Sequence, residues 1–345
     1  FWTSGPLTIA EVVGLDPRIA STHFEDESMD GRKIILDCDP GHDDAVAILL
    51  ALASPEEIDL LAITCVAGNA PLALTSLNAL RICELAGRQD IPVYSGCARP
   101  MVRKLVTAED VHGTSGLDLP GGATLPDPKM TLQSGHAVEF IVQTLLKEPP
   151  DSITLCALGP LTNVALALVQ EPSVASRIHE IVFMGGAAIN PGNTTPAAEF
   201  NIYVDPHAAD VVFRSGVPLT MMGLDVTHQV LVTAEREERI RKSGGRASTV
   251  VAELMSFYCR FDLDRYGMAG GPLHDPCVIA HLLDDSIFTT RHVNVKVEIH
   301  SELTLGETVA DWWYMTDLTP NCQVGEIADH ERFFELLIKR LARLP

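Results

Sequence analysis

The sequence predicts an α/β protein: an open, mainly parallel sheet with helices on both faces. Short apolar, largely β-branched runs alternate with segments of helical spacing along most of the 345 residues. Repeated strand–helix alternation indicates parallel strands joined by crossover helices. Hydrophobic residues make up 46% of the chain and aromatic residues only 6%, which is typical of helices packed on a sheet. Gly-x-Gly-x-x-Gly is absent from the first strand turn, so a dinucleotide-binding fold is not supported.

The first half of the chain begins with the clearest strand. Ile34, Ile35 and Leu36 form a buried run, Pro40 and Gly41 break it, and helical spacing follows as far as residue 52. The next expected elements are a strand at 58–66, a helix at about 72–86 and a short strand near 92–94. Residues 95–134 then lose all periodicity. A loop of this length is uncommon in a compact domain and is often a functional lid.

Alternation resumes in the second half. We expect helices at about 136–147, 161–169, 206–215, 274–283 and 331–344, with two more between 234 and 266, and strands at 152–157, 178–184, 218–222 and 291–300, the last pairing with 304–312. We therefore predict one domain over residues 32–345. The first methionine is Met29, and residues 1–31 are predicted to be an amino-terminal extension or an artificially added segment.

Composition excludes several classes of function. A net charge of −21 argues against binding a nucleic acid polymer or an anionic membrane surface, because both require basic patches. No apolar run approaches the roughly 18 residues of a membrane span. The eight cysteines occur singly, without a Cys-x-x-Cys pair, and are expected to be reduced core residues. We therefore predict a cytoplasmic protein with a small-molecule substrate.

Four carboxylates crowd the turn after the first strand: Asp37, Asp39, Asp43 and Asp44. One such Asp would be an ordinary turn residue or a first-turn acid favoured by the helix dipole. Four of them repel one another, and a hard cation such as Ca²⁺, which prefers carboxylate and carbonyl oxygens, accounts for them better. An EF-hand fails, because Gly41 and Ile48 stand where that motif needs acids. A Walker A loop is absent. A phosphotransfer nucleophile at the Asp-x-Asp pair remains a rival.

Other polar residues follow later strands. They are Asn69, the Leu158-Gly159 turn, the group Asn193, Glu199 and Asn201, and His274 with Asp275 after a Gly-rich turn. The carboxyl ends of parallel strands form one edge, where open α/β sheets bind ligands. Amides and acids that converge there supply hydrogen bonds for a polyhydroxylated ligand. His112 lies beside glycines in the long loop.

Several segments together match one family pattern. The run Asp37-Cys38-Asp39-Pro40-Gly41-His42-Asp43-Asp44 is similar to the amino-terminal signature of the nucleoside hydrolases, the inosine/uridine-preferring N-ribohydrolase family. Further matches, in family order, are residues 66–69, 112–118, 159–163, 184–186, 198–201 and 270–275. The resemblance extends from Lys33 to the carboxyl terminus. It is strongest toward the bacterial pyrimidine-specific ribonucleoside hydrolases.

This resemblance implies hydrolysis of the N-glycosidic bond of ribonucleosides with a bound Ca²⁺. The implied calcium ligands are Asp39, Asp44, Asp275 and the main-chain carbonyl of Leu158, with Asp37 orienting the site. The implied ribose contacts are Asp43, Asn69, Asn193, Glu199 and Asn201, with Met184 packing near the sugar. The family also implies a homodimer or homotetramer.

Glycosidic bond cleavage passes through an oxocarbenium-like state, which carboxylates stabilise. Our hypothesis is that Asp39 activates a calcium-bound water, while His274, or second His112, assists the departing base. Tyr266 is expected to contact the base. Asp262 stands where pyrimidine-specific members more often have Gln, and the neighbour of Asp275 is His274 rather than the Trp of purine-specific members. We expect uridine and cytidine as substrates, then inosine. The rivals are a ribonucleoside-binding module without turnover and an Asp-dependent phosphatase.

Overall fold

The centre of the structure is a mainly parallel sheet. The computed structural model describes residues 31–345, except for the side chains of Asp262 and Tyr266. Within this part of the chain, eight strands lie in the order β3-β2-β1-β4-β5-β6-β12-β9, and only β9 is antiparallel to its neighbour. Their bounds are β1 Arg32–Cys38, β2 Ile58–Cys65, β3 Val93–Ser95, β4 Ile153–Ala157, β5 Ile178–Met184, β6 Leu219–Met222, β9 Phe288–Val293 and β12 Cys322–Ala328. The predicted fold class is confirmed.

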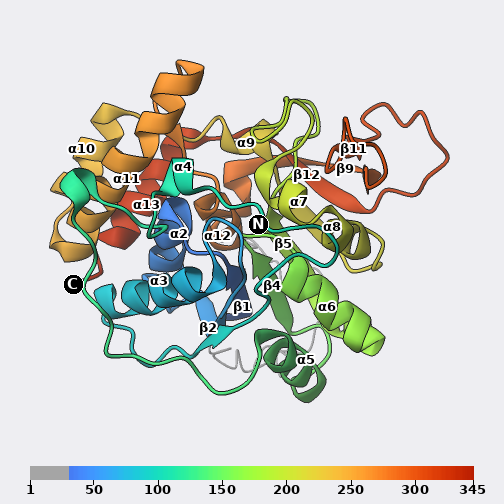
Figure 1. Cartoon of the computed structure of the whole chain (residues 1–345), viewed down its shortest axis with the longest axis horizontal. Coiled ribbons are helices and arrows are strands. Elements are labelled where there is room, and N and C mark those ends of the chain that lie inside the picture. The colour runs from blue at the N-terminus through green and yellow to red at the C-terminus, as the bar shows by residue number, and fades with distance from the viewer. Residues whose placement is uncertain (1–30) are drawn as a thin grey trace, which may run out of the picture. The chain divides into compact units, whose positions relative to one another are not determined.

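Helices cover both faces of this sheet (Figure 1). Ile34 and Leu36 of β1 pack into the core beneath one set of helices: α2 His42–Leu52, α3 Leu72–Leu85, α11 Gly245–Tyr266, α12 Pro276–Leu283 and α13 His330–Leu341. Ile35, which points the other way, packs beneath α5 Ala137–Lys147, α6 Thr162–Gln170 and α8 Pro206–Phe213. Because successive side chains alternate between the two faces, a strand covered on both sides reads as a continuous apolar run.

Two predictions about the carboxyl-terminal third are wrong. The expected strand at 291–300 is two strands, β9 and β10 Val295–Val297, separated at Asn294, and only β10 pairs with β11 Thr308–Ala310. The strand β12, which lies next to the edge strand β9, was missed, because Gly325 and Glu326 interrupt its apolar residues. Pairing with β6 and β9 on its two sides holds β12 in the sheet despite that weak local pattern.

Short elements were also missed. They are α4 Glu109–His112 inside the long loop, α7 Phe200–Val204, α9 Leu224–Thr227, the pair β7 Leu231–Val232 and β8 Gly271–Pro272, and the 3₁₀ turns at Pro120–Gly122, Pro172–Arg177 and Asp285–Ile287. Elements this short do not span enough residues to show a period. Two of them, α4 and α9, are adjacent to the candidate site described below.

The remaining predictions concern the cysteines, the membrane and the amino terminus. All eight cysteines are free and buried in the described chain, as expected of core residues. None of the described helices is long and apolar enough to cross a membrane. The predicted extension, residues 1–31, lies outside the described residues apart from Gly31, so the domain boundary stays a prediction.

Candidate functional site

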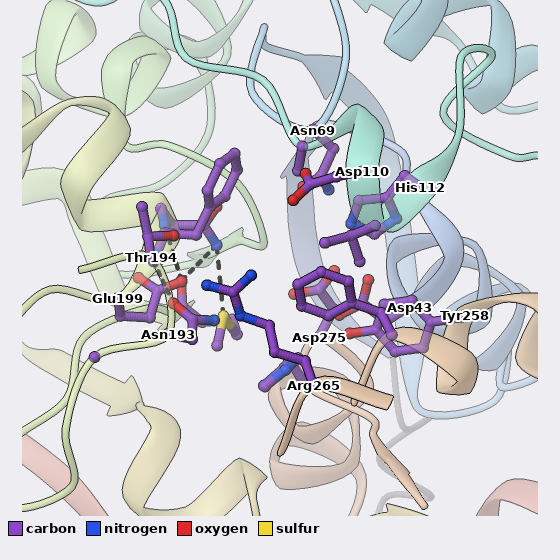
Figure 2. A pocket seen from close by; sticks show the side chains of 18 of the residues that line it. Asp43, Asn69, Asp110, His112, Asn193, Thr194, Glu199, Tyr258, Arg265 and Asp275 are labelled. Carbon is purple, nitrogen blue, oxygen red and sulfur yellow. Dashed lines mark hydrogen bonds between the residues drawn. The ribbon is translucent and has the colours of Figure 1, made fainter. Parts of the chain in front are cut away.

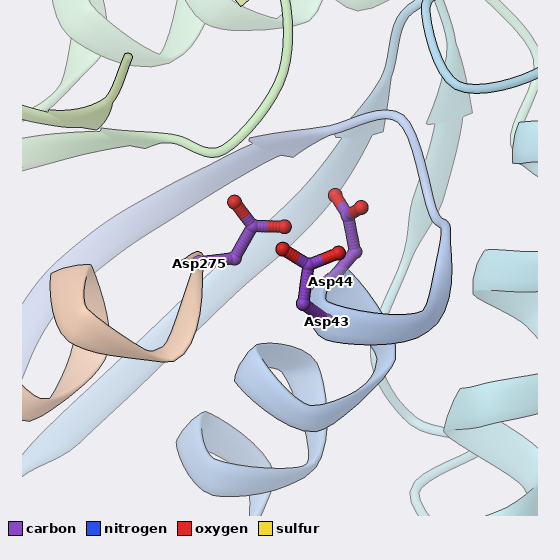
Figure 3. A group of neighbouring side chains, drawn as sticks. All are labelled: Asp43, Asp44 and Asp275. Carbon is purple, nitrogen blue, oxygen red and sulfur yellow. The ribbon is translucent and has the colours of Figure 1, made fainter. Parts of the chain in front are cut away.

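A group of carboxylates lies at the carboxyl edge of the sheet. Asp43 and Asp44 stand in the first turn of α2, and Asp275 immediately precedes α12. Carboxylate oxygens of these three residues lie within 4.8 Å of one another, and all three side chains are buried (Figure 3). Asp275 occupies the N-cap position of α12 but makes no side-chain capping bond. Its carboxylate is therefore directed to the acidic group, although an N-cap Asp usually binds its own helix.

Asp39 lies beside this group in a cradle that only glycines permit. A Cβ atom on Gly68 would come within 2.1 Å of Asp39 Oδ2, and one on Gly159 within 2.3 Å of Oδ1. Oδ2 accepts a hydrogen bond of 2.6 Å from the Asn69 backbone N–H. Among the described residues, Oδ1 is buried and has no hydrogen-bond partner. A buried carboxylate oxygen without a partner is costly, so its position suits a bound cation or water.

Asp37 and Asp44 are held by the protein itself. Asp37 Oδ1 accepts hydrogen bonds from Thr64 Oγ1 at 2.5 Å and from Asn163 Nδ2 at 2.8 Å. Asp44 accepts from the Asp39 and Gly41 backbone N–H groups and from Asn69 Nδ2. These bonds fix the orientation of both carboxylates before any ligand arrives.

Burial and mutual repulsion both destabilise the ionised forms of the Asp side chains at this edge of the sheet. Burial raises the pKa of Asp37 to about 7. Burial, followed by the charge of Asp44, raises the pKa of Asp43 to about 8. The pKa values of Asp39 and Asp275 are also raised well above their usual range, by burial first and by neighbouring carboxylates second. An opposite charge among these groups would favour their ionised forms.

The donor set fits a hard divalent cation. It consists of clustered carboxylates, the unpartnered oxygen of Asp39 and, at the end of β4, the nearby carbonyl of Leu158, without Cys or His among the clustered residues. The compact group contains Asp43 with Asp44 and Asp275, whereas the sequence indicated Asp39 with the latter two as ligands. The Leu158 carbonyl accepts a hydrogen bond of 2.7 Å from Asn201 Nδ2, and its second lone pair remains available for a cation.

A cavity of about 450 Å³ opens above these carboxylates. This volume is in the range of sites for small organic ligands. Ten of the residues chosen from the sequence line it: Asp43, Asn69, His112, Leu158, Met184, Asn193, Glu199, Asn201, His274 and Asp275. Asp37, Asp39 and Asp44 are buried and do not line it. The side chain of Tyr266 lies outside the described residues.

One set of lining residues, here called the strand-end wall, lies at the end of β5 or in the segments that follow β2, β4 and β5: Asn69, Leu158, Met184, Asn193, Glu199 and Asn201. Glu199 accepts hydrogen bonds from the backbone N–H groups of Gly186, Asn201 and Ile202, and thereby caps α7. Asn193 Oδ1 accepts from the Phe200 backbone at 2.9 Å. These hydrogen bonds therefore fix the orientation of the two side chains before a ligand binds.

A second set of lining residues, here called the helix wall, was not found from the sequence. It consists of Tyr258, Phe261 and Arg265 of α11 and Met268 just beyond it. Residues 258, 261 and 265 are spaced by three and four, so they share one face of the helix. That spacing was a usable signal, but an aromatic stripe on a helix is usually core packing. Figure 2 shows Arg265 between Glu199 and Asn193 on one side and Tyr258, His112 and Asp43 on the other.

Three histidines line the cavity: His112 and His274, which were chosen from the sequence, and His228, which directly follows α9 and was not. The Nδ1 atom of His112, in α4, lies 3.1 Å from the Nδ1 atom of His42. The Nε2 atom of His42 lies 2.9 Å from the Asp118 carbonyl oxygen. His42 was not singled out from the sequence, although it links the α2 turn to the long loop. His274 Nδ1 lies 2.8 Å from the Thr227 hydroxyl. Burial lowers the pKa of His112 and of His274 well below the usual value.

Comparison with known proteins places this architecture in a family. The model of the inosine-uridine preferring nucleoside hydrolases matches residues 34–335. The chain belongs to this family. The nucleoside hydrolase match begins in β1 and ends in α13. It therefore includes all residues that line the cavity, and every strand of the central sheet apart from the first two residues of β1.

Individual nucleoside hydrolases agree with this assignment. The chain is 50% identical over 310 residues to the pyrimidine-specific ribonucleoside hydrolase RihA of Citrobacter koseri, covering 90% of this chain and 97% of that protein. The structure of a purine-preferring ribonucleoside hydrolase from Gardnerella vaginalis is similar with a TM-score of 0.83 and 34% identity, over 90% and 98% of the two chains. A plant nucleoside hydrolase gives a TM-score of 0.82 at 36% identity, over 90% and 99%.

Proposed function

We propose that this protein hydrolyses the N-glycosidic bond of ribonucleosides, releasing the free base and ribose. The observation that carries the proposal is the shape of one cavity. Its floor is a buried group of carboxylates, the strand-end wall offers fixed amide and carboxylate groups suited to sugar hydroxyls, and the helix wall offers aromatic surface suited to a base. Nucleosides combine the two chemistries that these walls match.

We propose Ca²⁺ as the cofactor, with Asp39, Asp44, Asp275 and the Leu158 carbonyl as its ligands. The clustered oxygens and the unpartnered Asp39 Oδ1 support a hard cation. Asp43, which belongs to the same group, is either a further ligand or a ribose contact. When bound, such an ion lowers the pKa of a water and orients it.

Asp39 is the proposed general base. Its carboxylate is clamped between Gly68 and Gly159 beside Asp44, so it would lie next to a water held by the ion and could accept the proton of that water. The remaining carboxylates stabilise the positive charge that develops on the sugar. Asn69, Asn193, Glu199 and Asn201 would hold the ribose close to the reacting geometry.

The departing base must be stabilised as its bond to ribose breaks. His274 is the first candidate, since it lines the cavity next to Asp275, and His112 is the second. Both rings are buried, where a hydrogen bond to developing charge is stronger than in water. Met184 lines the same cavity and is proposed to pack near the sugar.

We propose pyrimidine ribonucleosides, uridine and cytidine, as the preferred substrates, with inosine next. The 50% identity to a pyrimidine-specific relative supports this order. The purine-preferring enzyme of similar structure is less similar in sequence, at 34%. A panel of nucleosides, followed by chromatography of the released bases, measures the order directly.

The decisive experiment is base release without phosphate. We expect free ribose from uridine in phosphate-free buffer; a requirement for phosphate, with ribose 1-phosphate as product, would identify a phosphorylase. Saturable binding with intact uridine after hours would identify a binding module. Phosphate release from phosphomonoesters would favour the Asp-dependent phosphatase, but no lysine lines the described cavity. Sedimentation will test the predicted homodimer or homotetramer.

A further inference from the structure

Thr227 contacts a cavity residue without lining the cavity itself. It ends the short helix α9, its side chain is fully buried, and its Oγ1 lies 2.8 Å from Nδ1 of His274. His274 lines the cavity, whereas Thr227 does not. The Nδ1 atom is therefore committed to the protein interior. Among the described residues, His274 Nε2 makes no hydrogen bond, and it is not one of the fully buried polar atoms that lack a partner. It is therefore the ring nitrogen that a ligand can reach.

The direction of this hydrogen bond follows from the groups available to the hydroxyl. A threonine hydroxyl has one hydrogen to donate and two lone pairs. In the described chain, its sole side-chain bond is the one to His274. A buried donor left without an acceptor costs about 1–3 kcal/mol, whereas an unused lone pair costs less. The hydroxyl therefore donates to Nδ1. A ring whose Nδ1 accepts a hydrogen bond carries its own hydrogen on Nε2.

We propose that Thr227 is a positioning residue, which holds His274 in the form that presents an Nε2 hydrogen to the departing base. This inference rests on the proposed function. As the bond between the sugar carbon and the base nitrogen breaks, its electron pair moves onto the base, where ring carbonyl oxygens share the charge. His274 Nε2–H donates a hydrogen bond to that charge and keeps its hydrogen. The reversed form would direct a lone pair at it and repel it.

The position of Thr227 is fixed by the rest of α9. Two residues earlier, Asp225 accepts hydrogen bonds of 2.7, 2.8 and 2.7 Å from the backbone N–H groups of Ala188, Ile189 and Asn190. These three residues begin the loop that carries Asn193 and Glu199. One short helix thus ties His274 to the loop of the strand-end wall, and α9 cannot move away from His274 without breaking the three bonds of Asp225.

The test compares two substrates and three variants. Thr227→Val removes the hydroxyl and keeps the shape, Thr227→Ser keeps the hydroxyl, and Thr154→Val is the matched control, because Thr154 is a buried strand residue whose hydroxyl has no partner in the described chain. We expect Thr227→Val to lower kcat on uridine about tenfold or more, part of the effect of a group that assists a leaving group. On p-nitrophenyl riboside, whose leaving group needs no help, kcat should be unchanged. Ser should restore uridine turnover, and Thr154→Val should match the wild type.

Equal losses on both substrates, or no loss on uridine, would overturn the role of Thr227. So would failure of Ser to restore turnover while the control stays active. An inactive wild type would instead reject the proposed function. If Thr227→Val does not fold, ¹⁵N spectra of histidine-labelled wild type, with the His274 signals assigned through His274→Gln, decide the question. Hydrogen on Nε2 supports the proposal, and hydrogen on Nδ1 alone contradicts it.

Discussion

The strand-end wall and the helix wall of the cavity are built from different kinds of element and differ in how firmly they are held. On the strand-end wall, Glu199 and Asn201 are buried and bind backbone groups of other segments. On the helix wall, Tyr258 is buried, but Arg265 is exposed, and Phe261 and Met268 are half-buried. A rigid sheet edge can fix reacting groups closely, whereas a helix face near solvent can change without disturbing the core. From this difference we propose that the first wall supports the chemistry and that the second wall determines the selectivity.

The largest expected effect tests the acidic floor beneath the strand-end wall. Asp39→Asn should lower kcat on uridine by about 10³-fold, because an amide cannot accept the proton of the attacking water. Steady-state kinetics measure the loss, and circular dichroism checks the fold. Asp329→Asn is the control: Asp329 caps α13 through the Arg332 N–H, a role that Asn fills equally well. Near-normal turnover by Asp39→Asn would remove Asp39 as the base.

Removal of the metal should affect the same floor in two ways. Treatment with a calcium chelator is expected to abolish base release and to lower the melting temperature, because the carboxylates of Asp43, Asp44 and Asp275 then repel one another without compensation. Elemental analysis should verify the loss of metal, and added Ca²⁺ should restore both properties. Full activity in verified metal-free protein would contradict the proposed cofactor.

A smaller effect is expected at His274, which lines the cavity but belongs to neither wall. His274→Ala should lower kcat on uridine about 10²-fold but should spare an activated p-nitrophenyl riboside, whose leaving group departs unaided. Parallel assays on the two substrates measure the ratio. An equal loss on both would mean that His274 only positions the sugar.

The smallest effect belongs to the helix wall. Phe261→Ala should change the ratio of kcat/KM for uridine and inosine by about tenfold, with kcat on the better substrate nearly retained, because lost apolar contact alters base binding more than bond breaking. Leu263→Ala on the same helix is the control: Leu263 is 45% exposed and does not line the cavity. If Phe261→Ala lowered kcat as much as Asp39→Asn does, the separation of chemistry and selectivity between the two walls would be wrong.

Much of the fold could be predicted from the sequence because its signals are local. The run at Ile34–Leu36, the break at Pro40-Gly41 and the helical spacing that follows gave β1, the turn and α2, and parallel connection brought the strand-end residues to one edge. The strand at Ile178–Met184 agrees residue for residue. The break at Asn294 and the strand β12 could not be predicted, because the pairing with neighbouring strands, rather than the local sequence pattern, determines where these strands begin and end.

The sequence by itself determined that acids, amides and two histidines would gather at the carboxyl edge of a parallel sheet, since strand direction and turn chemistry are written in neighbouring residues. Only the tertiary structure decided which acids close into one group, that Tyr258, Phe261 and Arg265 face them, and that Thr227 binds His274. These contacts join segments far apart in the chain, and the free energy that selects them comes from packing the whole core, which no local pattern records.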